Sequence, residues 1–241
     1  MSKKNSYAIA TLIVLSICLI ALIVLNIYNL SNNSTNNNET DEAIISYTND
    51  AGLEYQSKLY FVGDSTTYHF HKGGIELSHI FVPESLTLML DSEINSVTVG
   101  KSGLTIAQSI KKAKAEYVII TVGVNGADRF TEKQYKTYYK KLLDAINEAS
   151  PNTKIIIQSV FPVAKWYSDQ NKGITNKGID RINGWLKEIA LERSLPYLDT
   201  QSVLKNSDGA LKDEYENGDG VHMTEEAYQV ILEYIRTHAV K

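Results

Sequence analysis

The segment LYFVGDST at residues 59–66 is a short apolar run that ends in glycine, aspartate and serine. Continuous apolar runs bounded by turn residues are typical of strands covered on both faces, as in a parallel sheet. The same pattern returns further along the chain, at residues 96–99, 117–122, 154–160 and 195–199. The sequence therefore predicts a set of buried strands, the first of which leads into a serine at a turn.

Helical patterns alternate with these runs, at residues 105–115, 132–149, 176–193 and 224–238. In the third pattern, Ile179, Ile182 and Leu186 fall on one helical face. This alternation predicts a doubly wound, flavodoxin-like α/β domain with a five-stranded parallel sheet and right-handed crossovers. Because ligands in such folds bind beyond the carboxyl ends of the strands, the polar residues that follow the strands are the candidates for a site.

The N-terminal segment differs from the rest of the chain. Residues 8–25 carry no charged side chain, and with residues 26–28 they approach the roughly 20 residues that cross a bilayer as a helix. The run lacks the small-residue cleavage pattern of a signal peptide, so residues 7–28 are predicted to be a transmembrane anchor. A cleaved signal and a buried globular helix are the alternatives.

The charges around this segment predict its orientation. Lys3 and Lys4 precede it and acidic residues follow it. By the positive-inside rule, residues 1–6 form a cytoplasmic tail and the rest of the chain lies outside, attached to the cell membrane by a single span. Residues 29–57 follow as a polar extracellular linker, because the tract SNNSTNNNET at 31–40 buries too little apolar surface to fold.

Composition limits what the remaining residues, 58–241, can be. The chain has 241 residues, of which 43% are hydrophobic, and this is ample for one folded domain with a core. A net charge of −4 gives no basic surface for nucleic acid. The single cysteine, Cys18, excludes an intramolecular disulfide and a cysteine-rich zinc site.

Several polar residues follow the predicted strands or precede the last helix. They are Ser65, Gly103, Asn125, Asp219 and His222. A serine hydrolase needs a nucleophile, a base, a carboxylate that orients the base, and oxyanion donors, and these residues supply every role. Each also has a structural alternative as a turn or capping residue, but their joint occurrence at one edge of the sheet favours the chemical role.

The blocks that contain these residues resemble those of a known family. GDST at 63–66, SG at 102–103, GVN at 123–125 and DGVH at 219–222 have the order and spacing of GDSL-type SGNH hydrolases, over residues 58–241. The resemblance implies the SGNH hydrolase fold and an ester hydrolase that uses an acyl-enzyme, without cofactor or metal. Thr66 replaces the commoner leucine and Gly126 an aspartate of many relatives, which concerns the substrate's shape more than activity.

The resemblance assigns a role to each residue of the blocks. Ser65 would be the nucleophile, His222 the general base, and Asp219 the carboxylate that orients His222. The oxyanion hole would consist of the backbone N–H groups of Ser65 and Gly103 and the side-chain amide of Asn125.

Other side chains lie near these positions without belonging to a block. Trp166 and Tyr167 follow the fourth predicted strand, where aromatic rings stack on a sugar or an acyl chain; covering the core is the alternative. His69, His71 and His79 raise the alternative of a metal site, but no carboxylate or cysteine completes a ligand set at a recognisable spacing. A polar loop that flanks the pocket is the preferred interpretation.

These observations predict a membrane-anchored, extracytoplasmic serine esterase, with an acyl or acetyl ester of a carbohydrate as the substrate expected by analogy. One alternative is an O-acyltransferase that uses the same triad on a cell-surface glycan. The other is a catalytically silent surface binding module, which would lack a catalytic residue, and none is missing. Hydrolysis and transfer differ in how the pocket excludes water, which is a property of the tertiary structure.

Overall fold

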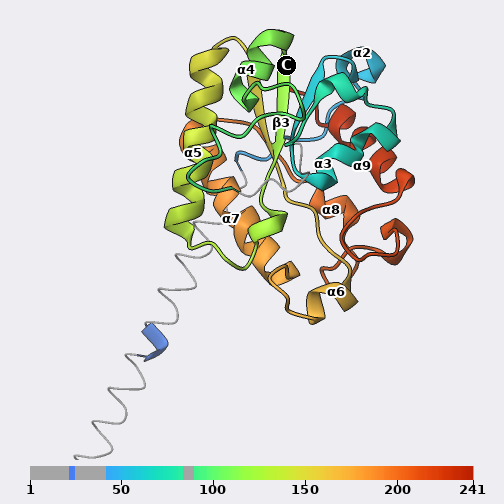
Figure 1. Cartoon of the computed structure of the whole chain (residues 1–241). Coiled ribbons are helices and arrows are strands. Elements are labelled where there is room, and N and C mark those ends of the chain that lie inside the picture. Colours follow the sequence, from blue (N-terminus) through green and yellow to red (C-terminus); the bar gives the residue numbers. More distant parts are fainter. Residues whose placement is uncertain (1–21, 25–41, 84–89, 241) are drawn as a thin grey trace, which may run out of the picture. The chain divides into compact units, whose positions relative to one another are not determined.

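Five parallel strands form the central sheet, in the order β2-β1-β3-β4-β5 (Figure 1). Their bounds are β1 Leu59–Gly63, β2 Ile80–Phe81, β3 Tyr117–Thr121, β4 Lys154–Gln158 and β5 Tyr197–Leu198. The computed structural model describes residues 22–24, 42–83 and 90–240. This strand order, with every pair parallel, is that of a doubly wound flavodoxin-like sheet, as the sequence predicted.

Helices cover both faces of the sheet (Figure 1). The core on one face includes side chains of α4 (Ile106–Ala113), α5 (Glu132–Ala149) and α7 (Asn176–Arg193). The core on the other face includes side chains of α2 (Gly52–Gln56), α8 (Gln201–Leu204) and α9 (Glu225–Thr237). Short helices lie in the connections: α3 Ser65–Tyr68, α6 Lys165–Asp169, and the 3₁₀ helices η1 His69–Gly73, η2 Leu77–His79, η3 Val124–Gly126 and η4 Asp213–Tyr215.

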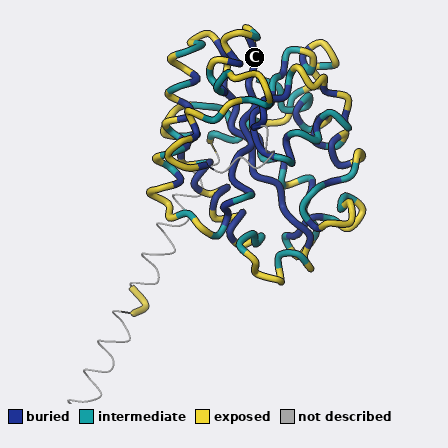
Figure 2. The backbone as a smooth tube through the Cα atoms, in the orientation of Figure 1, coloured by how far each residue is buried: buried dark blue, intermediate teal, exposed yellow. Residues whose placement is uncertain are grey.

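Successive strand residues supply the two cores in turn. Phe61, Ile119 and Ile156 belong to one core, whereas their neighbours Val62, Ile120 and Ile157 belong to the other. All of these side chains are fully buried, and Figure 2 shows the middle of the sheet as the buried centre of the domain. A strand covered on both faces is apolar on both faces, which is why these strands were recognisable as continuous runs.

The long helices begin where threonine caps them. The hydroxyls of Thr105, Thr131, Thr175 and Thr224 each accept a hydrogen bond from a backbone N–H of the first turn. At Thr105 and Thr131 a glutamine completes a capping box. The four predicted helices are confirmed, with small differences at their ends.

The predicted strand at residues 96–99 is wrong. Val99 forms only an isolated bridge with Pro83, while the place beside β1 is taken by Ile80 and Phe81, which pair with Phe61 and Val62. Ile80 and Phe81 are buried, one in each core. A strand of two residues is too short for its alternation to be seen in the sequence.

The folded domain also begins earlier than residue 58, because residues 43–241 form one compact unit. Ile44 forms a parallel bridge with Tyr197, and the backbone N–H of Ile45 donates to the Tyr197 carbonyl at 3.0 Å. Tyr55, in α2, is buried in the core beneath α9. Residues 43–57 of the predicted linker are therefore part of the domain, held by contacts with partners far away in the sequence.

The predicted cytoplasmic tail, almost all of the predicted anchor and the linker up to residue 41 lie outside the described residues. In the part of the chain that the structure describes, no helix is long and apolar enough to cross a membrane.

Candidate active site

Ser65 lies at the turn between β1 and α3. Gly63 ends the strand where no side chain fits, because a Cβ atom there would lie 2.4 Å from the Thr121 carbonyl oxygen. Asp64 then caps α3, as its Oδ1 accepts hydrogen bonds from the Thr66 backbone at 3.0 Å and the Thr66 hydroxyl at 2.7 Å. Ser65 is the first residue of α3, so its backbone N–H has no acceptor within the helix.

The structure brings Ser65 together with the two residues of the DGVH block. The Nε2 atom of His222 lies 2.8 Å from Ser65 Oγ, and the Nδ1 atom lies 2.7 Å from Asp219 Oδ2. The other carboxylate oxygen, Oδ1, accepts the backbone N–H groups of Val221 and His222, both at 2.8 Å. Asp219 thus orders its own loop and orients the imidazole toward Ser65.

Asn125 and Gly103 lie at the same edge of the sheet. Asn125 belongs to η3, which follows β3, and β3 pairs with β1 so that Thr121 stands beside Gly63. Asn125 is half-buried. Gly103 lies in an exposed loop with a left-handed φ of 68°, which favours glycine. The backbone of this loop is joined to the end of β2 by a 2.9 Å hydrogen bond from the Gly100 N–H to the Val82 carbonyl.

The two aromatic residues predicted at the active edge pack against the loop that holds His222. A Cβ atom at Gly220 would lie 2.7 Å from Tyr167 Cβ and 2.8 Å from the Trp166 ring. The Trp166 side chain remains 49% exposed, whereas Tyr167 is half-buried and packs partly against the core. Trp166 thus presents an open aromatic surface beside the Asp219–His222 loop.

The model of the GDSL-like Lipase/Acylhydrolase family matches residues 61–230, which include Ser65, His222 and Asp219. The chain belongs to this family. The resemblance seen in its sequence blocks is therefore confirmed.

Curated relatives of this chain are N-acylneuraminate cytidylyltransferases of two Streptococcus agalactiae strains, each 24% identical over 200 residues. The match covers 74% of this chain but 46% of those proteins, so the chain spans less than half of their length.

Solved structures share the fold. One is a Streptococcus pneumoniae protein whose name refers to platelet activating factor, with a TM-score of 0.56 and 16% identity, covering 90% of this chain and 97% of that chain. Another is the lipase/acylhydrolase from Enterococcus faecalis, with a TM-score of 0.52 and 15% identity, covering 74% of this chain and 95% of that chain.

Charge around the triad suits proton transfer at neutral pH. Partial burial opposes ionisation of Asp219, but hydrogen bonds from the backbone and the ring of His222 hold the pKa of this carboxyl below its usual value. Asp219 is therefore ionised at neutral pH, and its charge favours the protonated form of the neighbouring His222 ring. Asp64, on the other side of Ser65, is fully buried, and burial raises its pKa to about 6 despite the hydrogen bonds from Thr66.

His69, which the sequence placed in a polar loop flanking the pocket, lies next to His222. Its ring centroid lies 4.8 Å from that of His222, and its Nδ1 atom is buried without a hydrogen-bond partner. Burial, with a smaller effect of Lys72, lowers the pKa of His69 to about 4, so its ring is neutral at pH 7. The signal in the sequence was its position, about one helical turn after Ser65.

The other histidines are bound to the backbone. His71 Nδ1 lies 2.8 Å from the Tyr68 carbonyl, and His79 Nδ1 lies 3.0 Å from the Leu59 carbonyl. His79 also stacks on the Tyr60 ring. Among the described residues, no group of three histidine, cysteine or acidic side chains is placed to hold a metal ion.

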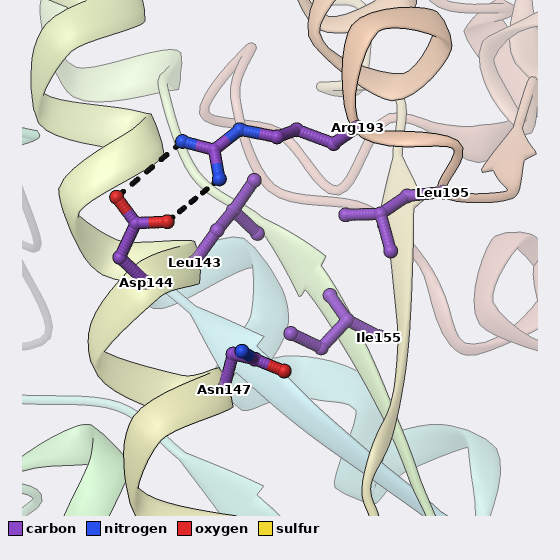
Figure 3. Close-up of a pocket in the computed structure, with 6 residues that line it drawn as sticks. All are labelled: Leu143, Asp144, Asn147, Ile155, Arg193 and Leu195. Atoms are coloured by element: carbon purple, nitrogen blue, oxygen red, sulfur yellow. Dashed lines mark hydrogen bonds and ion pairs between the residues drawn. The ribbon is translucent and has the colours of Figure 1, made fainter. Parts of the chain in front are cut away.

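Figure 3 shows a pocket elsewhere, between α5, the end of α7 and the start of β4. Arg193 closes one side of it by pairing with Asp144 through bonds of 2.7 and 3.3 Å. Ile155 lies near the first residue of β4, whereas Ser65 lies beyond the last residue of β1. None of the three triad residues lines this pocket.

Proposed function

We propose that the protein is an ester hydrolase that cleaves its substrate through an acyl-enzyme on Ser65. The observation that carries the proposal is the continuous hydrogen-bonded chain from Ser65 Oγ through both ring nitrogens of His222 to Asp219, with distances of 2.8 and 2.7 Å. This is the arrangement of nucleophile, base and orienting carboxylate that serine hydrolases use.

The first half of the reaction transfers the acyl group to the enzyme. His222 Nε2 takes the Ser65 proton as Oγ attacks the ester carbonyl, and Asp219 stabilises the resulting imidazolium. The negative charge that develops on the carbonyl oxygen is stabilised by the N–H groups of Ser65 and Gly103 and the amide of Asn125. The tetrahedral intermediate then collapses, the C–O bond to the alcohol breaks, and His222 returns its proton to the departing alkoxide.

The second half releases the acid. A water molecule gives a proton to His222 and attacks the acyl carbonyl, after which Ser65 leaves and regains its proton. The side chains of Asp219 and His222 are 51% and 24% exposed, so water reaches the catalytic pair. This favours hydrolysis over transfer to a sugar hydroxyl, which needs water to be excluded.

The proposed substrate is an acyl or acetyl ester of a carbohydrate. Trp166 offers a half-exposed ring next to the Asp219–His222 loop, and aromatic faces of this kind stack on sugars. The names of the curated relatives refer to N-acylneuraminate, which is itself a carbohydrate.

A serine-directed phosphonate tests the mechanism directly. It should label Ser65 in the full chain, and Ser65→Ala should abolish both labelling and hydrolysis of p-nitrophenyl esters of increasing chain length. Chelators should leave the activity intact. Inhibition by a chelator together with no labelling by the phosphonate would refute the triad mechanism.

We further propose that residues 7–28 anchor the enzyme in the cell membrane with the domain outside. Support comes from the uncharged run at 8–25 and from Lys3 and Lys4 before it. Protease added to intact cells should release a soluble, active domain by cutting the polar tract at 31–40. If the activity stays protected until the cells are lysed, the proposed orientation is wrong.

A further inference from the structure

The nucleophile and its base come from opposite ends of the domain, 157 residues apart, yet their reacting atoms lie 2.8 Å from each other. The element that joins them is α9, which begins at Glu225, shortly after His222. Figure 1 shows α9 beside α3, and α9 packs closely on η1, the segment that continues α3. One helix therefore follows the base and supports the segment that carries the nucleophile.

Tyr228, in α9, contacts the residue that follows the nucleophile. Its hydroxyl donates a 2.7 Å hydrogen bond to the backbone carbonyl of Thr66, the residue after Ser65, and its side chain is fully buried. Tyr228 cannot move away easily, because its ring packs edge-on against Phe70 at 5.2 Å and its Cβ faces Gly73, where an added methyl group would lie 3.1 Å away.

Thr66 is also held from its other side. Its N–H and its hydroxyl both donate to Asp64 Oδ1, at 3.0 and 2.7 Å. Asp64 and Thr66 are 1% and 3% exposed, whereas Ser65 between them is partly exposed. The polar groups of the two buried residues are hydrogen-bonded to each other. Buried polar groups keep their partners because an unpaired one is costly, and this restricts the backbone of the turn.

We propose that Tyr228 is a positioning residue for Ser65. By bonding the Thr66 carbonyl, it holds the nucleophile turn at the distance from the His222 loop that the Ser65–His222 hydrogen bond requires. This inference rests on the proposed acyl-enzyme mechanism. Tyr228 itself touches no substrate and moves no proton, so its effect should appear in the reactivity of Ser65 and not in substrate binding.

The test compares Tyr228→Phe with a matched control. Tyr139→Phe also removes a hydroxyl from a fully buried tyrosine, whose acceptor is the carbonyl of Ile120 within β3, at 3.5 Å. We expect Tyr228→Phe to lower kcat about tenfold with KM unchanged, which is less than the roughly 100-fold cost of a 1 Å misplacement. The rate constant for phosphonate labelling of Ser65 should fall in parallel, and Tyr139→Phe should change neither quantity.

The outcomes separate the inference from the function on which it rests. If the wild-type enzyme is not labelled at Ser65, the proposed mechanism fails. If the wild type is labelled and Tyr228→Phe reacts at the same rate, or if both tyrosine variants lose reactivity equally, Tyr228 is merely structural. Should Tyr228→Phe be unfolded at the assay temperature, the wild type and both tyrosine variants are compared at a lower temperature at which thermal melts show all three folded. A kcat and a labelling rate of Tyr228→Phe equal to those of the wild type there would overturn the proposal.

Discussion

Replacing Asp219 by asparagine removes the acceptor of the His222 ring proton and leaves the loop largely intact. The amide oxygen can still accept the N–H groups of Val221 and His222, which Oδ1 holds at 2.8 Å. The amide nitrogen takes the place of Oδ2, which lies 2.7 Å from His222 Nδ1, and an N–H group cannot accept. Asp219→Asn therefore isolates one charge-assisted hydrogen bond from the rest of the loop.

The size of the effect follows from that bond. A hydrogen bond to a charged group contributes about 1.5–3 kcal/mol, which corresponds to roughly 10- to 150-fold in kcat. The amide turns a donor toward Nδ1 and so favours the wrong imidazole tautomer, which places Asp219→Asn in the upper part of this range. The Asp219 side chain is 51% exposed, so in Asp219→Ala water can replace the lost carboxylate, and we expect a smaller loss.

His222→Ala should be far more damaging, because it removes the group that moves the proton. Steady-state hydrolysis of a p-nitrophenyl ester by the three variants, with folding checked by thermal melts, gives the expected order: His222→Ala loses most, then Asp219→Asn, then Asp219→Ala. If His222→Ala keeps more than about a tenth of the wild-type activity, a deficit below about 1.4 kcal/mol, the base lies elsewhere and His69 is the next candidate.

Three other substitutions have effects that differ in kind. Asn125→Ala should lower kcat by roughly 10²–10³ with little change in KM, since its amide acts on the developing oxyanion; a change confined to KM would contradict this in steady-state kinetics. Gly220→Ala should lower the melting temperature and kcat together, because Gly220 has a φ of 82° and a Cβ there would lie within 2.9 Å of Trp166 and Tyr167; the left-handed backbone alone costs about 1–2 kcal/mol. Burial lowers the pKa of folded His69 from the usual 6.5 to about 4, so the unfolded chain binds a proton at this ring more readily. Stability is therefore lost as the pH falls from 6.5 through 4. His69→Gln should therefore reduce the loss of unfolding free energy between pH 7 and pH 4.5, measured by urea unfolding. Asp64, whose pKa is raised to about 6, affects stability with the opposite sign, but it is present in both proteins. If the variant and the wild type lose the same free energy, His69 does not contribute.

The elements that could be predicted from the sequence are the long helices, which bury one apolar face, and the central strands, which bury both. β1, β3 and β4 carry apolar side chains on both faces because both faces are covered. The long helices carry threonine caps that mark where they begin. The residues of the proposed site were also recognisable, since each follows a strand end or precedes a helix. The local sequence pattern is sufficient to predict a residue's place where that residue faces solvent, faces the core or bonds within its own turn.

The tertiary structure alone decided which short segments pair and which side chains meet. Ile80 and Phe81, and not residues 96–99, pair with β1, and Ile44 pairs with Tyr197. Pairing depends on which segments the folded chain places side by side. The contacts of His69 with His222 and of Tyr228 with the Thr66 carbonyl span more than half of the chain. Such contacts leave no periodic pattern in the sequence, because the packing of α9 against the rest of the domain sets the distances between residues that are far apart along the chain.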